Sequence, residues 1–309
     1  MTSASEPSVS IVIPVLNAAA FLPTLMPALL CQGPVPPMEI LILDSGSRDG
    51  TVALAAAYER TRVIKVDKFS HSRTRNLGIA QAMGDIVVLM TQDALPANPD
   101  WLHELTLPFR TPSVAATFSR QIPRADANPM ERFFLATHFP ETGKTYRRQP
   151  GQQHLAFQRE VFLSNVSAAL RREVALQHPF EGHLIMSEDQ QFARDVLMAD
   201  LEVRYIPSSV VLHSHNYTCM QALKRYFDGA YSLTQIFSRH DLLASLQMGS
   251  QYIKCESWMM IRHHQLWLLR YLGFVLAKSL GTFLGHFAAR LPLWLTLRLS
   301  QHAYYWRQT

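Results

Sequence analysis

The stretch SVSIVIPVL, residues 8–16, decides the fold class. It is β-branched and almost wholly apolar, which is typical of a strand that is covered on both faces. Segments of the same kind recur at MEILILD (38–44), RVIKVD (62–67) and DIVVLMT (85–91), and helix-like segments separate them. This alternation predicts a parallel, doubly wound α/β sheet over residues 8–91.

After residue 91 the pattern loosens. VAATFSRQ (114–121) predicts a strand, residues 120–152 a long loop or lid, and SNVSAALRREV (164–174) a strand that runs into a helix. SEDQQFARDVLMA (187–199) predicts a helix capped by Ser187. LEVRYIP (201–207) and SSVVLHSH (208–215) predict two strands, and TCMQALKRYFDGAYSLTQIF (218–237) a long helix interrupted near Gly229.

The composition fits one large domain with an appendage, or two domains. The chain has 309 residues, of which 48% are hydrophobic and 17% charged, so a sizeable core is expected. The net charge of +5 suits a phosphate-bearing ligand or an anionic membrane but demands neither. The three cysteines lie far apart without CxxC spacing, which predicts a reducing, cytoplasmic setting. The first ten residues lack the features of a signal peptide.

From residue 241 onward the composition shifts to Leu, Trp and Phe with helical spacing. Charged residues such as Arg270 and Lys278 interrupt every apolar run, so no transmembrane helix is expected. Pro292 should end or kink a helix. We therefore predict a helical extension that lies at a membrane interface or forms a homodimer.

Polar residues follow the predicted strands at the edge where such sheets bind ligands. The first strand is followed by neither GxGxxG nor GxxxxGK[ST], which disfavours a dinucleotide cofactor and a P-loop. Asp44 could accept hydrogen bonds from a base or a ribose, or could form an Asx turn. FSHSRTRNLG (69–78) places Arg75 and Asn76 where a helix begins, which favours a phosphate or is a solvated basic turn.

Three further segments carry acids or histidines. Asp93 follows the fourth strand, where it could bind Mg²⁺ or Mn²⁺ together with substrate phosphates, or could cap a turn. Of the adjacent acids Glu188 and Asp189, one could act as a general base while the other complements the helix dipole. His213 and His215 alternate along a predicted strand, so they could share a metal, contact a diphosphate, or be buried structural histidines.

In this order, the segments IPVLN, LDSGSRDGT, RTRNLG, TQDALP, SEDQQ and HSH resemble the family 2 inverting glycosyltransferases of the GT-A fold, over about residues 8–240. More narrowly, FSHSRTRNLG, MTQDALP, SRQIPRADANPMERF, SNVSAALRREV and HSHNYT resemble bacterial rhamnosyltransferases that use dTDP-L-rhamnose. The resemblance implies a GT-A catalytic domain over residues 1–240, with a mostly parallel Rossmann-like sheet flanked by helices. Residues 241–309 would then form a helical C-terminal extension.

The resemblance also implies roles for matching residues. Asp189 would be the general base, with Glu188 beside it. Asp93 would bind Mg²⁺ or Mn²⁺ as the last acid of a DxD-type motif, and His213 or His215 would lie near the metal and the diphosphate. The implied nucleotide-sugar ligands are Pro14, Val15, Asn17, Asp44, Ser45, Gly46, Arg75, Asn76, Gln92, Asp93 and Arg225.

One residue departs from the family pattern. Thr91 stands where the metal motif usually begins with an acid, so metal binding would rely more on the diphosphate and a histidine. The same Thr-Gln-Asp-Ala form occurs in the rhamnosyl subgroup that the chain resembles.

The implied activity is inverting transfer of L-rhamnose from dTDP-β-L-rhamnose to a glycan or polyprenyl-diphosphate-linked acceptor. It would serve surface polysaccharide or O-antigen synthesis at the inner face of the cytoplasmic membrane, and no nucleic-acid partner is expected. Alternatives are a UDP- or GDP-sugar donor on the same fold, and a non-catalytic nucleotide-sugar-binding protein. A nucleotidyltransferase is disfavoured because PVLNAAAFLP (14–23) lacks a glycine- and basic-rich loop.

Overall fold

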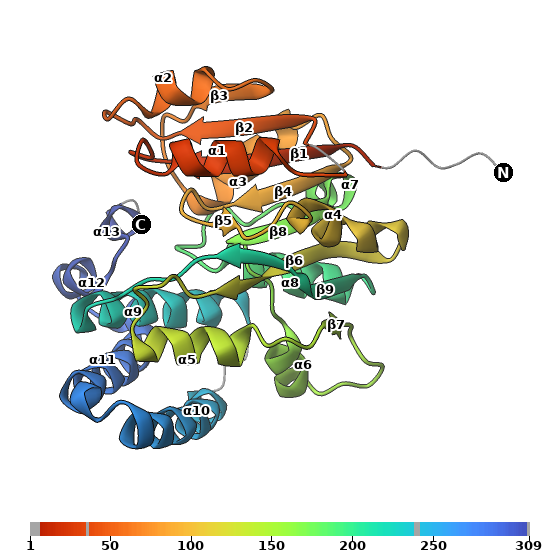
Figure 1. Cartoon of the computed structure of the whole chain (residues 1–309). Coiled ribbons are helices and arrows are strands. Elements are labelled where there is room, and N and C mark those ends of the chain that lie inside the picture. The colour runs from red at the N-terminus through yellow and green to blue at the C-terminus, as the bar shows by residue number, and fades with distance from the viewer. Residues whose placement is uncertain (1–6, 35–36, 238–241, 308–309) are drawn as a thin grey trace.

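The computed structural model describes residues 7–34, 37–237 and 242–307 (Figure 1). Its N-terminal half alternates strands and helices as predicted: β1 (Val9–Val15), α1 (Leu22–Leu30), β2 (Glu39–Asp44), α2 (Thr51–Ala56), β3 (Thr61–Lys65), α3 (His71–Gln81) and β4 (Ile86–Met90). These four strands are parallel in the order β3-β2-β1-β4, which confirms the doubly wound arrangement. Their carboxyl ends therefore share one edge of the sheet.

The rest of the sheet is mixed. It adds β5 (Leu95–Pro96), β6 (Val114–Ile122), β7 (Lys144–Tyr146), β8 (Ser167–Arg171) and β9 (Glu202–Leu212) in the overall order β3-β2-β1-β4-β8-β6-β9-β5, with β7 paired to β9. β8 runs antiparallel to β4 and to β6, while β6 and β9 are parallel. Because Met90 pairs with Ser167, the residues before β8 lie beside the loop that follows β4.

Apolar side chains cover both faces of the sheet. Along β1, Val12 belongs to the core on one face, whereas Ile11 and Ile13 belong to the core on the other. The same alternation along β2 places Leu41 on the first face and Ile42 on the second. Two-sided burial explains why these strands are continuously apolar and could be recognised from sequence.

The helices of this region are α4 (Trp101–Thr106), α5 (Pro129–His138), α6 (His154–Glu160), α7 (Arg172–Gln177), α8 (Glu188–Met198) and α9 (Cys219–Ile236), with a 3₁₀ turn, η1, at Leu107–Arg110. The predicted loop over residues 120–152 is wrong, because it contains α5 and β7. Asn128 caps α5 by accepting the backbone N–H of Glu131, and Pro129 occupies its first turn. The proline and asparagine that suggested a loop are thus helix-start residues.

Two further predictions are wrong. The helix over residues 218–237 is not interrupted at Gly229; α9 runs through it, and a capping box of Thr218 and Gln221 fixes its start. The two strands predicted over residues 201–215 are one strand, β9, with a register shift opposite Ser119 and Arg120. His213 and His215 consequently follow the strand rather than lie on it.

The C-terminal region consists of α10 (Leu242–His263), η2 (Gln265–Trp267), α11 (Leu268–His286), η3 (Ala288–Arg290), α12 (Leu293–Leu299) and α13 (Ala303–Trp306). Pro292 is the N-cap of α12, so it separates two helices as predicted. Figure 1 places α10 and α11 at the end of the molecule opposite α2 and β3. The predicted domain boundary at residues 240/241 lies outside the described residues.

One segment of this region, Gln265–His286, has the length and the mean hydropathy, 1.2, of a membrane span. Length and composition alone are weak evidence for a membrane span, because core helices of soluble proteins share them. A third of the segment (33%) is buried inside the structure. The sequence-based expectation of no span rested on Arg270 and Lys278, and the Lys278 side chain is in fact only 11% exposed and lies 3.7 Å from Glu256.

Candidate active site

A pocket of about 420 Å³ opens beside the carboxyl edge of β4, a size within the range of about 300–1,000 Å³ that is usual for small-molecule sites. The loop after β4, the segment before β8, the start of α8 and the loop after β9 surround it. α3, α5, α9, α11 and the turn before α13 also contribute to its wall. Its charged and histidine lining residues are His71, Arg75, Asp93, Glu131, Glu188, Asp189, His213, His215, Arg225, Lys278 and His302.

Asp93, His213 and His215 form one cluster in this pocket. Their ligand atoms all lie within 4.8 Å of one another, and the Nε2 atom of each histidine is 3.6 Å from Oδ2 of Asp93. One carboxylate and two imidazoles are ordinary ligands of Mn²⁺ and similar divalent cations. The two histidines belong to the loop after β9. Because β5 pairs with the end of β9 (Leu95 with Leu212), this loop lies beside Asp93.

The surroundings of the cluster keep both imidazoles in the neutral form that can bind a cation. Nδ1 of His213 lies 2.9 Å from Oε1 of Gln121, and Nε2 of Gln121 donates to Ser164. The glutamine oxygen is therefore the acceptor, so Nδ1 of His213 carries the proton and Nε2 faces Asp93 with a free lone pair. Burial lowers the pKa of His213 to about 4, and it also lowers the pKa of His215. Both imidazoles are thus neutral at pH 7, which is their ligating form.

Asp93 is ionised in the same range. Burial alone would raise the pKa of its carboxyl, but His213 and His215 nearby hold that pKa below the ordinary value. Thr91, at the place of a missing acid, also lines the pocket. The residues present therefore fit a divalent cation through one anionic and two neutral ligands.

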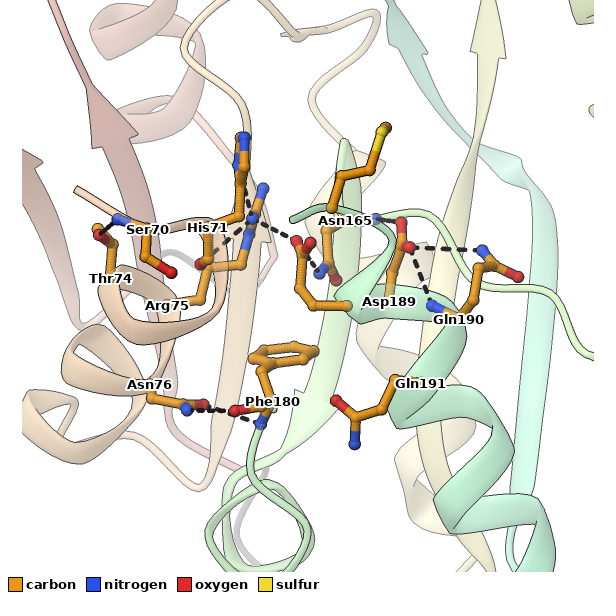
Figure 2. A network of polar contacts seen from close by, with 12 residues as sticks. Ser70, His71, Thr74, Arg75, Asn76, Asn165, Phe180, Asp189, Gln190 and Gln191 are labelled. Carbon is orange, nitrogen blue, oxygen red and sulfur yellow. Dashed lines mark hydrogen bonds and ion pairs between the residues drawn. The ribbon is translucent and has the colours of Figure 1, made fainter. Parts of the chain in front are cut away.

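The adjacent acids of α8 have different partners (Figure 2). Glu188 is buried and accepts a hydrogen bond of 2.5 Å from Nη1 of Arg75, and Nδ2 of Asn165 donates to it at 3.3 Å. Burial would raise the pKa of Glu188, but Arg75 and His71 lower it. Glu188 is therefore a fixed anion that neutralises Arg75.

Asp189, by contrast, is held by backbone N–H groups. It accepts the backbone N–H of Asn165 at 3.3 Å and that of Gln190 at 2.9 Å, and it lines the pocket. Burial and the neighbouring charge of Glu188 raise the pKa of Asp189 to about 6. Ser187, in the left-handed region with φ 62°, makes the tight turn that starts α8 at these acids. A carboxylate with this pKa is suited to act as a general base near neutral pH.

The model of the family described as glycosyl transferase family 2 matches residues 10–178. The chain belongs to glycosyl transferase family 2. The O-antigen chain rhamnosyltransferase RfbN of Salmonella typhimurium is 32% identical over 303 residues, which are 96% of each chain. The O-antigen chain rhamnosyltransferase WbaN of Salmonella anatum is 33% identical over 274 residues, 87% of this chain and 86% of its own. The family model ends before Asp189, but both relatives extend across it.

Solved structures identify the architecture of this glycosyltransferase as a GT-A fold. A mannosyltransferase from Pyrobaculum calidifontis, solved with GDP-Man and Mn²⁺, superposes with a TM-score of 0.60 at 16% identity, and the match covers 93% of this chain and 87% of the other. Glucosyl-3-phosphoglycerate synthase from Mycobacterium tuberculosis superposes with a TM-score of 0.51 at 20% identity over 76% of this chain and 82% of its own. The predicted fold class is thereby confirmed.

The residues predicted to line a nucleoside pocket lie together at the ends of β1 and β2, outside the 420 Å³ pocket. Val15 pairs with Asp44, and the Asp44 carboxylate accepts the backbone N–H groups of Gly46 and Ser47, both at 3.1 Å. This is the Asx turn that was one of the two interpretations of Asp44. Gly46 has φ 99°, which favours glycine. Contacts of Pro14, Asn17, Ser45 and their neighbours with a nucleotide stay predictions.

Two other predicted ligands form hydrogen bonds to backbone groups, and their contacts with a nucleotide sugar stay predictions. Both amide atoms of Asn76 bond the backbone of Phe180, at 2.8 and 3.1 Å (Figure 2). Gln92 likewise holds the backbone of Leu16, accepting at 2.9 Å and donating at 3.2 Å. Both side chains connect segments that are far apart in sequence, and the structure assigns them this positioning role.

Several pocket residues could not be found from sequence. Gln121, Glu131, Tyr226, Lys278 and His302 all line the pocket. Oε1 of Glu131 accepts the backbone N–H of His215 at 3.0 Å, so α5 supports the metal-side loop. His302 packs edge-on against the His71 ring at 5.2 Å. The helical C-terminal region thus contributes to this pocket, which no local motif indicates.

Proposed function

We propose that this glycosyltransferase transfers L-rhamnose, with inversion, from dTDP-β-L-rhamnose to a glycan acceptor in O-antigen or related surface polysaccharide synthesis. The observation that carries the choice of sugar is the match to RfbN, an O-antigen chain rhamnosyltransferase, across 96% of both chains. The observation that supports inversion is a carboxylate with a raised pKa, Asp189, in the pocket beside Asp93 and its histidines.

Asp189 is the base of the proposed displacement. It takes the proton of the acceptor hydroxyl as that oxygen forms a bond to the anomeric carbon. The bond from that carbon to the diphosphate oxygen breaks on the opposite face, and its electron pair leaves with dTDP. A β-L donor therefore gives an α-L-rhamnoside. Its pKa of about 6 leaves Asp189 mostly ionised at pH 7.

Negative charge grows on the departing diphosphate, and cations near it stabilise the transition state. The side chain of Arg225 is exposed to the pocket and lies 5.5 Å from the Tyr217 ring. Asp93, His213 and His215 would hold Mg²⁺ or Mn²⁺, which supplies charge neutralisation of the diphosphate when bound. Arg75 is neutralised by Glu188 and positions that acid rather than serving as a free phosphate ligand.

A donor panel tests the sugar. Purified protein is incubated with dTDP-rhamnose, UDP-glucose or GDP-mannose and a lipid-linked glycan acceptor, and nucleotide release is measured with and without Mn²⁺. Release with dTDP-rhamnose and the appearance of an α-linked rhamnoside are expected. Preference for a UDP- or GDP-sugar would overturn the donor, and absence of turnover with all three would favour the non-catalytic, nucleotide-sugar-binding alternative.

The proposed setting is the cytoplasmic side of the membrane. The cysteines Cys31, Cys219 and Cys255 are free, which suits a reducing compartment. A polyprenyl-diphosphate-linked acceptor would be presented at the membrane surface, and a homodimer is the competing explanation of the apolar C-terminal helices. Activity towards a soluble acceptor glycan measures sugar transfer independently of membrane binding and of dimerisation.

A further inference from the structure

The C-terminal helices expose many large apolar side chains. They lie on α10, η2, α11 and α12, and on the first three of these the most exposed are Leu266 (101%), Leu269 (87%), Leu276 (70%), Trp258 (60%) and Ile261 (59%). Soluble monomeric proteins rarely expose contiguous apolar surface of this kind, so such a surface usually marks an interaction site.

On α11 the exposed residues form one stripe. Leu269, Leu272, Leu276, Leu280 and Phe283 recur at spacings of three or four residues, and each is roughly half exposed or more. This spacing places them on one side of the helix.

The opposite side of α11 is buried. Phe274 and Lys278 line the catalytic pocket, and Gly281 and Gly285 lie against the backbone of α9. The helix therefore separates the pocket from the apolar stripe.

The charge of this region is almost entirely positive. Between residues 242 and 309 the sequence contains one acid, Glu256, and seven Lys or Arg: Lys254, Arg262, Arg270, Lys278, Arg290, Arg298 and Arg307. Glu256 is fully buried and paired with Lys278 at 3.7 Å. The exposed surface of these helices is consequently apolar and cationic, without an anionic side chain.

Three arginines of the C-terminal helices accompany tryptophans, and one of these pairs lies on α12. Arg262 lies over Trp258 at 5.3 Å, Arg270 over Trp267 at 5.1 Å, and Arg298 over Trp294 at 5.8 Å. Tryptophan and arginine side chains combine an apolar body with a polar end, and both are favoured where hydrocarbon meets lipid headgroups.

We propose that α10, η2 and α11 form a docking surface for an anionic lipid bilayer, with the stripe of α11 in the interface and the arginines against the headgroups. Charge complementarity favours this occupant over a second copy of the chain. An isologous dimer through the same face would bring cationic surfaces together without acids to neutralise them. Insertion of α11 across the bilayer is also disfavoured, because it would separate Lys278 from the buried Glu256 and α11 from α9.

The docking surface explains how the enzyme would reach a lipid-linked acceptor. This inference rests on the proposed function for the identity of that acceptor. A docked α11 would leave the pocket about one helix diameter, roughly 10–12 Å, from the bilayer. A glycan that projects from a lipid-linked diphosphate could reach Asp189 at that height while its lipid stays in the membrane.

The test is flotation of the full-length protein with vesicles of phosphatidylcholine alone or enriched in phosphatidylglycerol. We expect flotation with the anionic vesicles, weakening as salt rises. Arg262→Gln with Arg270→Gln should weaken anionic-vesicle binding roughly thirtyfold at low salt. Leu269→Ser with Leu276→Ser should weaken it roughly tenfold or more. A matched control, Met83→Ser with Leu176→Ser, changes exposed apolar residues outside these helices and should leave flotation unchanged.

Absence of flotation with either vesicle, or equal flotation of all variants, would overturn the proposal. So would a change from dimer to monomer in the leucine variant without loss of vesicle binding. Retention in membranes after alkaline carbonate extraction would replace docking by a spanning helix. Transfer to a soluble acceptor glycan is measured in parallel: the proposal expects it unchanged in both variants, whereas its absence in the unmodified protein counts against the proposed function alone.

Discussion

Substitution of Asp189 by Asn tests the chemistry of the site most directly. The amide has nearly the same shape as the carboxylate, but it cannot take a proton from an acceptor hydroxyl. Asp189 accepts the backbone N–H groups of Asn165 and Gln190 with different oxygens. One of these two bonds is lost with the single amide oxygen, which costs about 1 kcal/mol of stability. The variant should therefore fold.

The expected loss of kcat is about 100- to 10,000-fold, the usual contribution of a positioned general base. The affinity for dTDP should stay within about twofold, because charge loss at Asp189 leaves Asp93, Arg225 and the histidines in place. Steady-state transfer with dTDP-rhamnose gives the first quantity, and titration calorimetry with dTDP and Mn²⁺ gives the second. Asp200→Asn is a matched control: Asp200 is exposed at the end of α8, and its φ of 58° suits asparagine.

The pH profile gives an independent readout. A base must be deprotonated to act, so kcat of the unmodified enzyme should fall as pH drops through about 6, the pKa of Asp189. The Asn variant should lack this acidic limb. Near-normal transfer by the variant with intact donor binding, or an unchanged acidic limb, would refute the assignment of Asp189 as the base.

Three further substitutions probe the rest of the pocket. Asp93→Ala should weaken Mn²⁺-dependent dTDP binding, and identical calorimetric heats with and without Mn²⁺ in both proteins would count against this metal site. Glu188→Gln leaves Arg75 as a buried, unneutralised cation, so urea unfolding should reveal a loss of about 3–5 kcal/mol; a loss below about 1 kcal/mol would contradict the buried pair. His302→Ala removes a ring that lines the pocket and packs against His71, so KM for the acceptor glycan should rise about tenfold, while the exposed control His263→Ala should leave this KM unchanged.

The sheet could be predicted where burial leaves a local pattern. β1, β2 and β4 are covered on both faces, so most of their residues are apolar, and this pattern is visible in the sequence. β9 is longer and shifts register halfway, because an irregularity lies opposite Ser119 and Arg120. Its two halves consequently look like two strands.

The region around α5 was predicted as a loop for another reason: Pro and Asn residues are common both at helix starts and in loops.

The sequence predicted candidate residues for the site but not how their side chains are arranged in space. Asp93, Asp189 and the two histidines each stand at the end of an element, and the family resemblance joined them. Only the resemblance separated Glu188 from Asp189; the residue pattern itself could not, because the difference between them is made by Arg75, 113 residues earlier. The proton position on His213 likewise depends on Gln121, which lies in the middle of an unremarkable strand.

The C-terminal region shows how packing alone can add residues to a site. A Cβ atom at Gly281 would stand 2.4 Å from the carbonyl oxygen of Leu223, and one at Gly285 would stand 2.2 Å from that of Phe227. Only glycine allows α11 to approach the α9 backbone so closely. Because Phe274 and Lys278 lie on this same side of α11, the two glycines set how far both side chains reach into the pocket. The shape of this side of the pocket is thus determined in part by small residues that carry no chemistry themselves.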